Sequence, residues 1–243
     1  DLPDQIPLFP LLGAILLPRA TLPLNVFEPR YLSMINDVMS GDRVVGVIQP
    51  VTAAGSGMHQ ASGYEDDNDD DDGDDEEEFD IPASIESPEG KAVGLRRFGC
   101  VGRVTSYQEL DDGRLVITLT GISRFRMTSE VETLEAYRLA KVDYSEFEDD
   151  FVEGLGEETI DREQLLSVLK AYLESNRMTA DWSSILRASS EFLINSLSVM
   201  SPYGSEEKQA LLEAGDLKTR GNVLMALAEM ELASGGEGGG TIQ

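Results

Sequence analysis

The sequence predicts an α+β protein in which a small barrel or sandwich of short strands precedes an α-helical bundle. Three observations indicate this class. Short apolar runs, many of them closed by proline or glycine, recur through the first 144 residues outside the stretch 52–90. Apolar residues at helical spacing fill the chain beyond residue 158. An acidic, glycine-containing stretch at residues 145–158 separates the two patterns.

The first 50 residues predict four strands and one helix. Proline has no backbone N–H, so it belongs at the end or the edge of a strand and keeps these apolar runs short. Strands are expected at residues 6–9, 14–17, 22–27 and 44–49. Pro29 suits the first turn of a helix, and this helix should run from about residue 29 to 40. The residues that share one face of it are Tyr31, Met34, Ile35 and Val38.

The middle of the chain predicts a β-hairpin followed by a last strand. Residues 101–107 and 115–120 alternate in polarity around the turn Asp111-Asp112-Gly113. Gly121 interrupts the second run and predicts a bulge, after which strands are expected at 122–127 and 138–144. Arginines concentrate in this region: Arg96, Arg97, Arg103, Arg114, Arg124 and Arg126. They are either outward-facing strand residues or a positive face for an acidic peptide, the chain's own acidic insertion, or RNA.

Four amphipathic segments in the last third of the chain predict a helical bundle. Leu165, Leu169 and Tyr172 belong to the first apolar stripe, and Val223, Leu224 and Leu227 to the last. The second stripe spans Ile185, Leu186, Phe192, Leu193, Leu197 and Met200. A helix is also expected to begin at Ser205 and to end at Gly215.

Acidic residues dominate the composition, with a formal net charge of −27. Thirteen of them lie between residues 65 and 80, and without these the charge is still −14. Phosphate backbones are bound mainly through Lys and Arg, so nucleic acid and anionic membranes are disfavoured partners. Residues 52–90 are expected to be a disordered acidic insertion. Part of it, at residues 68–79, has a calcium-loop spacing, but Phe79 stands where the last ligand should be, so no calcium site is predicted.

No residue pattern predicts a catalytic, cofactor or metal site. His59 is the one histidine and lies in the insertion, away from any rigid scaffold. Cys100 is the one cysteine and is expected as a small core residue in a strand, which suits a reducing cytoplasm. There is no phosphate-binding loop, no signal-peptide pattern and no apolar run long enough for a transmembrane helix.

Several stretches together resemble the N-terminal domain of Lon proteases in its stand-alone bacterial form. They are L-F-P-L and L-P-L-N-V-F-E-P-R-Y within residues 8–31, G-C-V-G-R-V-T-S-Y at 99–107, Y-R-L-A-K-V-D-Y at 137–144 and E-E-K-Q-A-L-L-E-A at 206–214. The resemblance implies a PUA-like pseudo-barrel with one helix at residues 1–146, a linker at 147–157, a helical bundle at 158–234 and a disordered tail at 235–243. A peptidase S16 label would follow the family name, because the ATPase and Ser–Lys protease motifs have no match here.

By this resemblance the chain should be a non-catalytic, cytoplasmic module that binds polypeptide segments or unfolded proteins, in quality control or proteolysis. A protease or chaperone partner would fit that role, and no cofactor is implied. A sheet edge or a groove between barrel and bundle could hold an extended peptide. The candidate surface residues at the strand-to-helix corner are Phe27, Glu28, Arg30 and Tyr31. The alternative for these four is a purely structural role, as a packed corner in which Arg30 pairs with an acidic residue. The alternatives are an RNA-binding PUA-like module and a small-molecule sensor.

Overall fold

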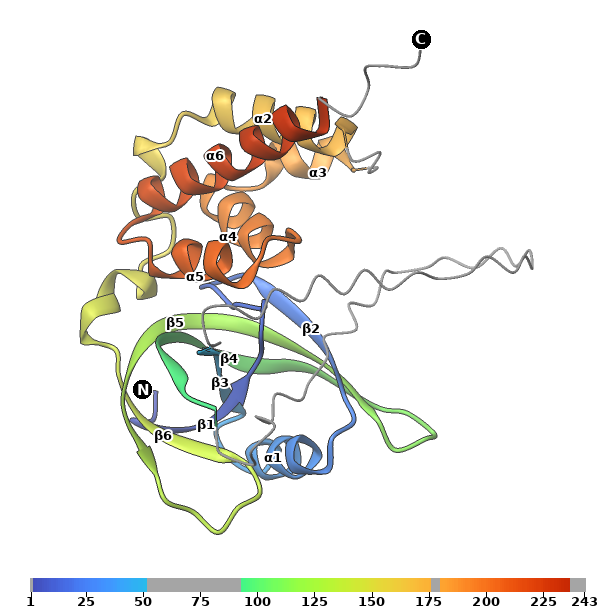
Figure 1. Cartoon of the computed structure of the whole chain (residues 1–243), viewed down its shortest axis with the longest axis vertical. Coiled ribbons are helices and arrows are strands. Elements are labelled where there is room, and N and C mark those ends of the chain that lie inside the picture. The colour runs from blue at the N-terminus through green and yellow to red at the C-terminus, as the bar shows by residue number, and fades with distance from the viewer. Residues whose placement is uncertain (1, 52–92, 176–179, 237–243) are drawn as a thin grey trace.

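A computed structural model describes residues 2–51, 93–175 and 180–236 of the chain. The strands form a barrel-like layer at one end of the molecule, and five of the helices lie at the other (Figure 1). The acidic insertion, His59, the calcium-loop spacing at 68–79 and residues 237–243 of the tail lie outside the described residues. The predicted α+β class, with strands preceding the helical bundle, is confirmed.

The strands form one mixed sheet that closes on itself. They are β1 Gln5–Pro10, β2 Thr21–Val26, β3 Val44–Pro50, β4 Leu95–Glu109, β5 Leu115–Val131 and β6 Arg138–Asp143. Their order is β2-β5-β4-β3-β1-β6, and β6 also pairs with the C-terminal part of β5. Among the described strands, β1 and β3 are the one parallel pair. Because β5 bridges to both β4 and β6, β2 is the one described strand with a single neighbour.

Helix α1, Pro29–Met39, lies at the end of the barrel away from the helical bundle (Figure 1). Pro29 occupies its first turn, and Tyr31, Met34 and Ile35 are buried, as their spacing predicted. The helix ends at Met39, one residue before the expected boundary. Its apolar face packs into the main core beside Phe9 of β1 and Val47 of β3.

The strand predicted at residues 14–17 is wrong, although its side chains are fully in the core. The backbone at Gly13 and Arg19 has positive φ angles of 74° and 64°, so the segment turns sharply at both ends. Pro18 has no N–H to donate, and the segment makes a single bridge, from Pro18 to Gly121, instead of a ladder. Residues 14–19 thus form an irregular, mostly buried segment, here called the crossing segment, which lies against Gly102 of β4 and Gly121 of β5.

The predicted hairpin is confirmed as β4 and β5, joined by a turn in which Gly113 has a φ of 86°. The expected bulge is also present, because the pairing shifts between Val101–Ser123 and Gly102–Gly121. At Gly121 a Cβ atom would lie 1.9 Å from the carbonyl oxygen of Leu17. Glycine is therefore required where the crossing segment touches β5.

The acidic stretch after β6 is folded against the sheet. It contains two short 3₁₀ helices, η1 Ser145–Phe151 and η2 Glu157–Thr159. The ring of Phe147 lies 5.9 Å from that of Phe98 on β4, edge to face, and Asp150 is buried. The division of the chain at residues 147–157 stays a prediction, because this stretch contacts both the sheet and the helices.

Five α-helices follow among the described residues. They are α2 Arg162–Ser175, α3 Trp182–Arg187, α4 Ser190–Met200, α5 Ser205–Glu213 and α6 Leu217–Gly236. The single stripe predicted over residues 185–200 is wrong, because the Ser189 side chain accepts a hydrogen bond from the Phe192 N–H and begins a new helix there. Leu186, Phe192 and Met200 are accordingly exposed, while Leu193, Ile194 and Val199 are buried.

The main apolar core is continuous between the sheet and the helices. It joins Leu16 and Leu22 from the β part to Ile194 and Leu211 from the helices. A second, smaller core lies inside the barrel around Phe125. The sheet and the bundle are therefore packed as one body.

We predict that Gly121→Ala destabilises the protein by about 2 kcal/mol or more, since overpacking a close backbone contact typically costs 1–3 kcal/mol. Urea unfolding followed by circular dichroism would measure the change. Gly215→Ala is the matched control, because nothing lies within 4 Å of a Cβ at Gly215. Equal stability of the two variants would show that the contact between Leu17 and position 121 does not require glycine.

Candidate functional site

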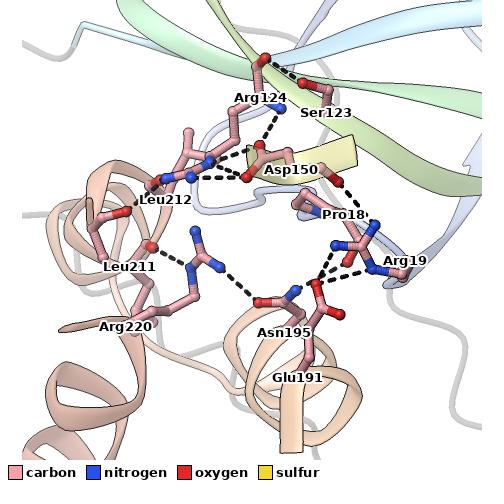
Figure 2. A network of polar contacts seen from close by, with 11 residues as sticks. Pro18, Arg19, Ser123, Arg124, Asp150, Glu191, Asn195, Leu211, Leu212 and Arg220 are labelled. Atoms are coloured by element: carbon pink, nitrogen blue, oxygen red, sulfur yellow. Dashed lines mark hydrogen bonds and ion pairs between the residues drawn. The ribbon is translucent and has the colours of Figure 1, made fainter. Parts of the chain in front are cut away.

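A buried ion pair connects β5 to the helical part (Figure 2). Arg124 on β5 and Asp150 at the end of η1 are both almost fully buried. The Arg124 Nη2 and Nε atoms donate to the Asp150 carboxylate at 2.8 and 2.9 Å, and the Arg124 backbone N–H donates to it at 2.8 Å. Arg124 Nη1 donates to the carbonyl oxygens of Leu212 and Ala214, so one guanidinium holds η1 and the end of α5 on the strand.

A second set of polar contacts holds α4 to the crossing segment and α6 to α4 and α5 (Figure 2). Arg220 on α6 donates to the Leu211 carbonyl at 3.0 Å and to Asn195 Oδ1 at 2.9 Å. The amide of Asn195 donates to the Pro18 carbonyl at 3.0 Å. Arg19 Nε donates to the Glu191 carboxylate at 2.9 Å. The orientation of the bundle on the barrel is therefore set by directional bonds as well as by apolar packing.

One interpretation of the arginine cluster was that its side chains face outward from the strands. This is wrong for Arg124, because η1 and the end of α5 cover that part of β5. Several of the other arginines in the cluster are paired with carboxylates. Arg126 pairs with Asp143 at 2.6 Å and with Glu146, and Arg114 pairs with Asp112 at 2.7 Å. Arg96 pairs with Glu206. These pairings leave less positive charge for a phosphate backbone than the sequence alone indicated.

A cleft of about 370 Å³ lies where the barrel meets the bundle. One wall is the turn Leu12–Ala14 and the start of β2, and the other is the α4–α5 connection. The residues that line it are Leu12, Gly13, Ala14, Thr21, Leu22, Pro23, Val199, Met200, Ser201, Pro202, Tyr203 and Lys208. Most of these side chains are apolar, and Lys208 is the one with a formal charge. The lining suits an apolar ligand with one polar or charged feature.

The strand β2 brings an unpaired sheet edge to this cleft. The Gly121 N–H donates to the Ala20 carbonyl, which makes Thr21 and Thr120 a non-hydrogen-bonded pair of the antiparallel ladder. The backbone groups of Thr21, Pro23 and Asn25 therefore face away from β5, and no other described strand pairs with them. Pro23 has no N–H, so its place on an open edge costs no ladder bond.

Lys208 was missed as a site residue by the sequence reasoning, which named Met200 of the cleft's helical wall only as part of an apolar stripe. It lies on α5 and is 3% exposed. Its Nζ donates to the carbonyl oxygens of Ser198 and Val199, at the C-terminal end of α4. Burial lowers the pKa of its ammonium to about 8. The available signal was spacing, because Lys208 lies three and four residues before the buried Leu211 and Leu212 and so shares their face.

The structure places the four predicted surface residues together at the corner between β2 and α1. Arg30 pairs with Glu28 at 2.8 Å and lies over the Tyr31 ring, 4.7 Å from its centroid. Tyr31 is 5% exposed, and its ring centroid is 4.3 Å from that of Phe9. Phe27 is 48% exposed. Of the four side chains, Phe27 offers the most surface, and the role of the corner stays a prediction.

Other expected features can be placed in the described part of the chain. Cys100 is fully buried in β4, and burial raises the pKa of its thiol. Within residues 2–51, 93–175 and 180–236, no cluster of His, Cys, Asp or Glu could hold a metal ion. None of the helices described there has both the length and the apolar character needed to cross a membrane.

Comparison with known proteins identifies the family. The family model of the ATP-dependent protease La (LON) substrate-binding domain matches residues 5–229. The chain belongs to this family. It is 24% identical over 237 residues to a Lon protease of Flavobacterium johnsoniae and 26% identical over 226 residues to one of Desulfosudis oleivorans. These matches cover 96% and 90% of this chain but 25% and 23% of the relatives, so the chain spans about a quarter of their length.

Two solved structures share the fold. A Lon N-terminal domain protein from Xanthomonas campestris aligns with a TM-score of 0.54 and 21% identity, over 91% of this chain and 97% of that one. The N-terminal domain of the Mycobacterium avium complex Lon protease aligns with a TM-score of 0.58 and 13% identity, over 93% and 98% of the two chains. The predicted resemblance to Lon N-terminal domains is thereby confirmed.

We predict that Asp150→Ala costs about 3–5 kcal/mol of unfolding free energy, because it leaves the Arg124 charge buried without its partner. Chemical denaturation would measure the loss. Asp149→Ala removes the same group from the exposed neighbouring position and should change stability by less than about 0.5 kcal/mol. A similar, small effect of both substitutions would show that the pair does not hold the bundle to the barrel.

We also predict a pH-dependent stability term from Lys208. Its pKa is about 8 in the folded chain and about 10.4 in an unfolded chain. Between these values the unfolded state binds more protons, so this lysine makes the free energy of unfolding rise with pH. Unfolding titrations from pH 7 to 10 should show the wild type gaining stability relative to Lys208→Met. A stability difference that is constant over this range would contradict the assignment.

Proposed function

We propose that this chain binds extended, largely apolar polypeptide segments along the open edge of β2, with the cleft at one end of that edge. The membership in a family named for substrate binding supports the class of function. The observation that carries the location is the open backbone of Thr21, Pro23 and Asn25 beside an apolar cleft. A peptide that adds a strand gains main-chain hydrogen bonds from the edge and side-chain contacts from the cleft.

The dimensions of the edge fit a short peptide. From Thr21 to Phe27 an extended chain covers about 20 Å at about 3.3 Å per residue. In Figure 1, β2 extends from the helical bundle to α1, so its two ends lie at the cleft and at the corner. The exposed Phe27 then offers an apolar contact at the far end of the same peptide. A segment of about seven residues would reach both.

Membership in the family also supports a proposal for the biological setting. A module of this kind would deliver or retain unfolded polypeptides in cytoplasmic quality control or proteolysis, with a protease or chaperone as its partner and without ATPase or protease activity of its own. The strongly acidic composition, with its net charge of −27, favours apolar or basic polypeptides over nucleic acid. A small apolar molecule is the competing occupant, because the cleft volume is within the range of ligand pockets.

We predict that Met200→Glu weakens peptide binding at least about tenfold, since it places a charge in the apolar cleft in place of a contact worth about 1.5 kcal/mol or more. The probe is a nine-residue peptide of alternating valine and threonine with an N-terminal fluorescein, and fluorescence anisotropy gives its Kd. Met200 is 57% exposed, so the variant should fold normally. Phe27→Ser tests the other end of the edge and should weaken binding several-fold.

Met230→Glu on α6 is the matched control, because Met230 is 60% exposed and does not line the cleft. It should bind the peptide as the wild type does. A second control peptide with prolines at alternate positions should bind poorly, because it cannot donate to the strand edge. Equal loss in Met200→Glu and Met230→Glu, or equal binding of the proline peptide, would place the site elsewhere.

A further inference from the structure

Lys208 brings a buried positive charge to the wall of the cleft. Its side chain is 3% exposed, yet it lines the cleft together with Ser201 and Tyr203. A lysine ammonium has three protons to donate. The structure gives acceptors for two of them, the Ser198 and Val199 carbonyl oxygens. One donor position remains for a further acceptor.

The charge of Lys208 has no carboxylate partner among the described residues. The ion pairs of the described chain involve other cations, and the two acceptors of Lys208 are neutral carbonyls. Carbonyls at a helix C-terminus carry partial negative charge and compensate part of a full positive charge. A buried charge without an ionic partner is costly, so a negatively charged group entering the cleft would be favoured there.

The position of the cleft at the start of β2 limits which negative group can reach Lys208. The cleft lies beside Thr21, the first residue of β2. A peptide paired antiparallel to β2 would therefore end, at its C-terminus, beside Thr21. Antiparallel pairing is also slightly the more stable arrangement per residue. The other lining side chains are neutral, so the site fits an apolar chain end that carries a single carboxylate.

We propose that the cleft receives the C-terminal end of a bound polypeptide, and that Lys208 forms an ion pair with its terminal carboxylate. This inference rests on the proposed function and deepens it: the chain would select polypeptides with an apolar, free C-terminus. An Asp or Glu side chain near the peptide's end carries the same chemical group, and the experiment separates these two sources.

Three N-terminally fluorescein-labelled peptides of alternating valine and threonine, each ending in leucine, test the proposal with the full chain. The first has a free terminal carboxylate, the second a terminal carboxamide, and the third a carboxamide with glutamate at the penultimate position. We expect the carboxamide to bind about tenfold more weakly than the free acid, because a charge-assisted hydrogen bond is lost. The third peptide should bind as weakly as the second.

Variants of the protein supply the second half of the test. Lys208→Met should bind the free acid and the carboxamide with equal affinity. That affinity should be weaker than the affinity of the wild type for the free acid. Lys170→Met is the matched control, because Lys170 is an exposed lysine on α2 outside the cleft, and it should keep the wild-type preference. The comparison of peptides on the wild-type protein does not depend on how well Lys208→Met folds.

Each other result overturns the proposal in a distinct way. If the wild type binds the free acid and the carboxamide equally, the carboxylate contact is wrong while peptide binding itself stands. If the glutamate peptide matches the free acid, the terminal source is wrong. If Lys208→Met retains the preference, another residue makes the contact. If no peptide binds, the proposed function falls and this inference falls with it.

Discussion

The arrangement of this molecule depends on the ion pair between Arg124 and Asp150. Both groups are buried, and each carries several hydrogen bonds, so the cost of removing two charges from water is offset only while all of the partners are present. Because Arg124 also binds the carbonyls that end α5, the pair fixes the helical part relative to β5. The cleft exists between these two parts, and its shape is therefore set by a contact outside its own lining.

The segment between β1 and β2 is the second constraint. It is apolar and buried but makes no ladder, and it passes so close to Gly121 that no side chain fits at that position. The same segment carries the turn that forms one wall of the cleft and accepts a hydrogen bond from Asn195 of α4. Packing, rather than secondary structure, positions this wall, and it leaves the edge of β2 without a strand partner.

A binding role suits this construction. The sheet and the helices are held together firmly by buried polar contacts, whereas the edge of β2 and the cleft keep main-chain and apolar groups available. Lys208 carries the one formal charge of the cleft lining. Its ammonium donates to two carbonyl oxygens and has no carboxylate partner among the described residues. In the proposed function, such a site would bind through shape, main-chain pairing and one ionic contact.

The sequence by itself determined the class of fold, most strands, helix α1 and the family. The spacing of apolar residues and the positions of proline and glycine constrain the backbone of their own segment, so they can be interpreted without the rest of the fold. Pro29, Gly113 and Gly121 were each predicted from their own conformational needs. Tertiary structure alone decided that residues 14–17 form no strand and that Arg124 is internal. The helix that begins after Ser189 has a local capping signal, which the sequence prediction missed. Tertiary structure also decided where the cleft lies, because Thr21, Met200 and Lys208 meet only when the bundle packs on the barrel. Which elements pack on one another, and which side chains pair between them, depend on neighbours distant in the chain, and no local pattern records these contacts.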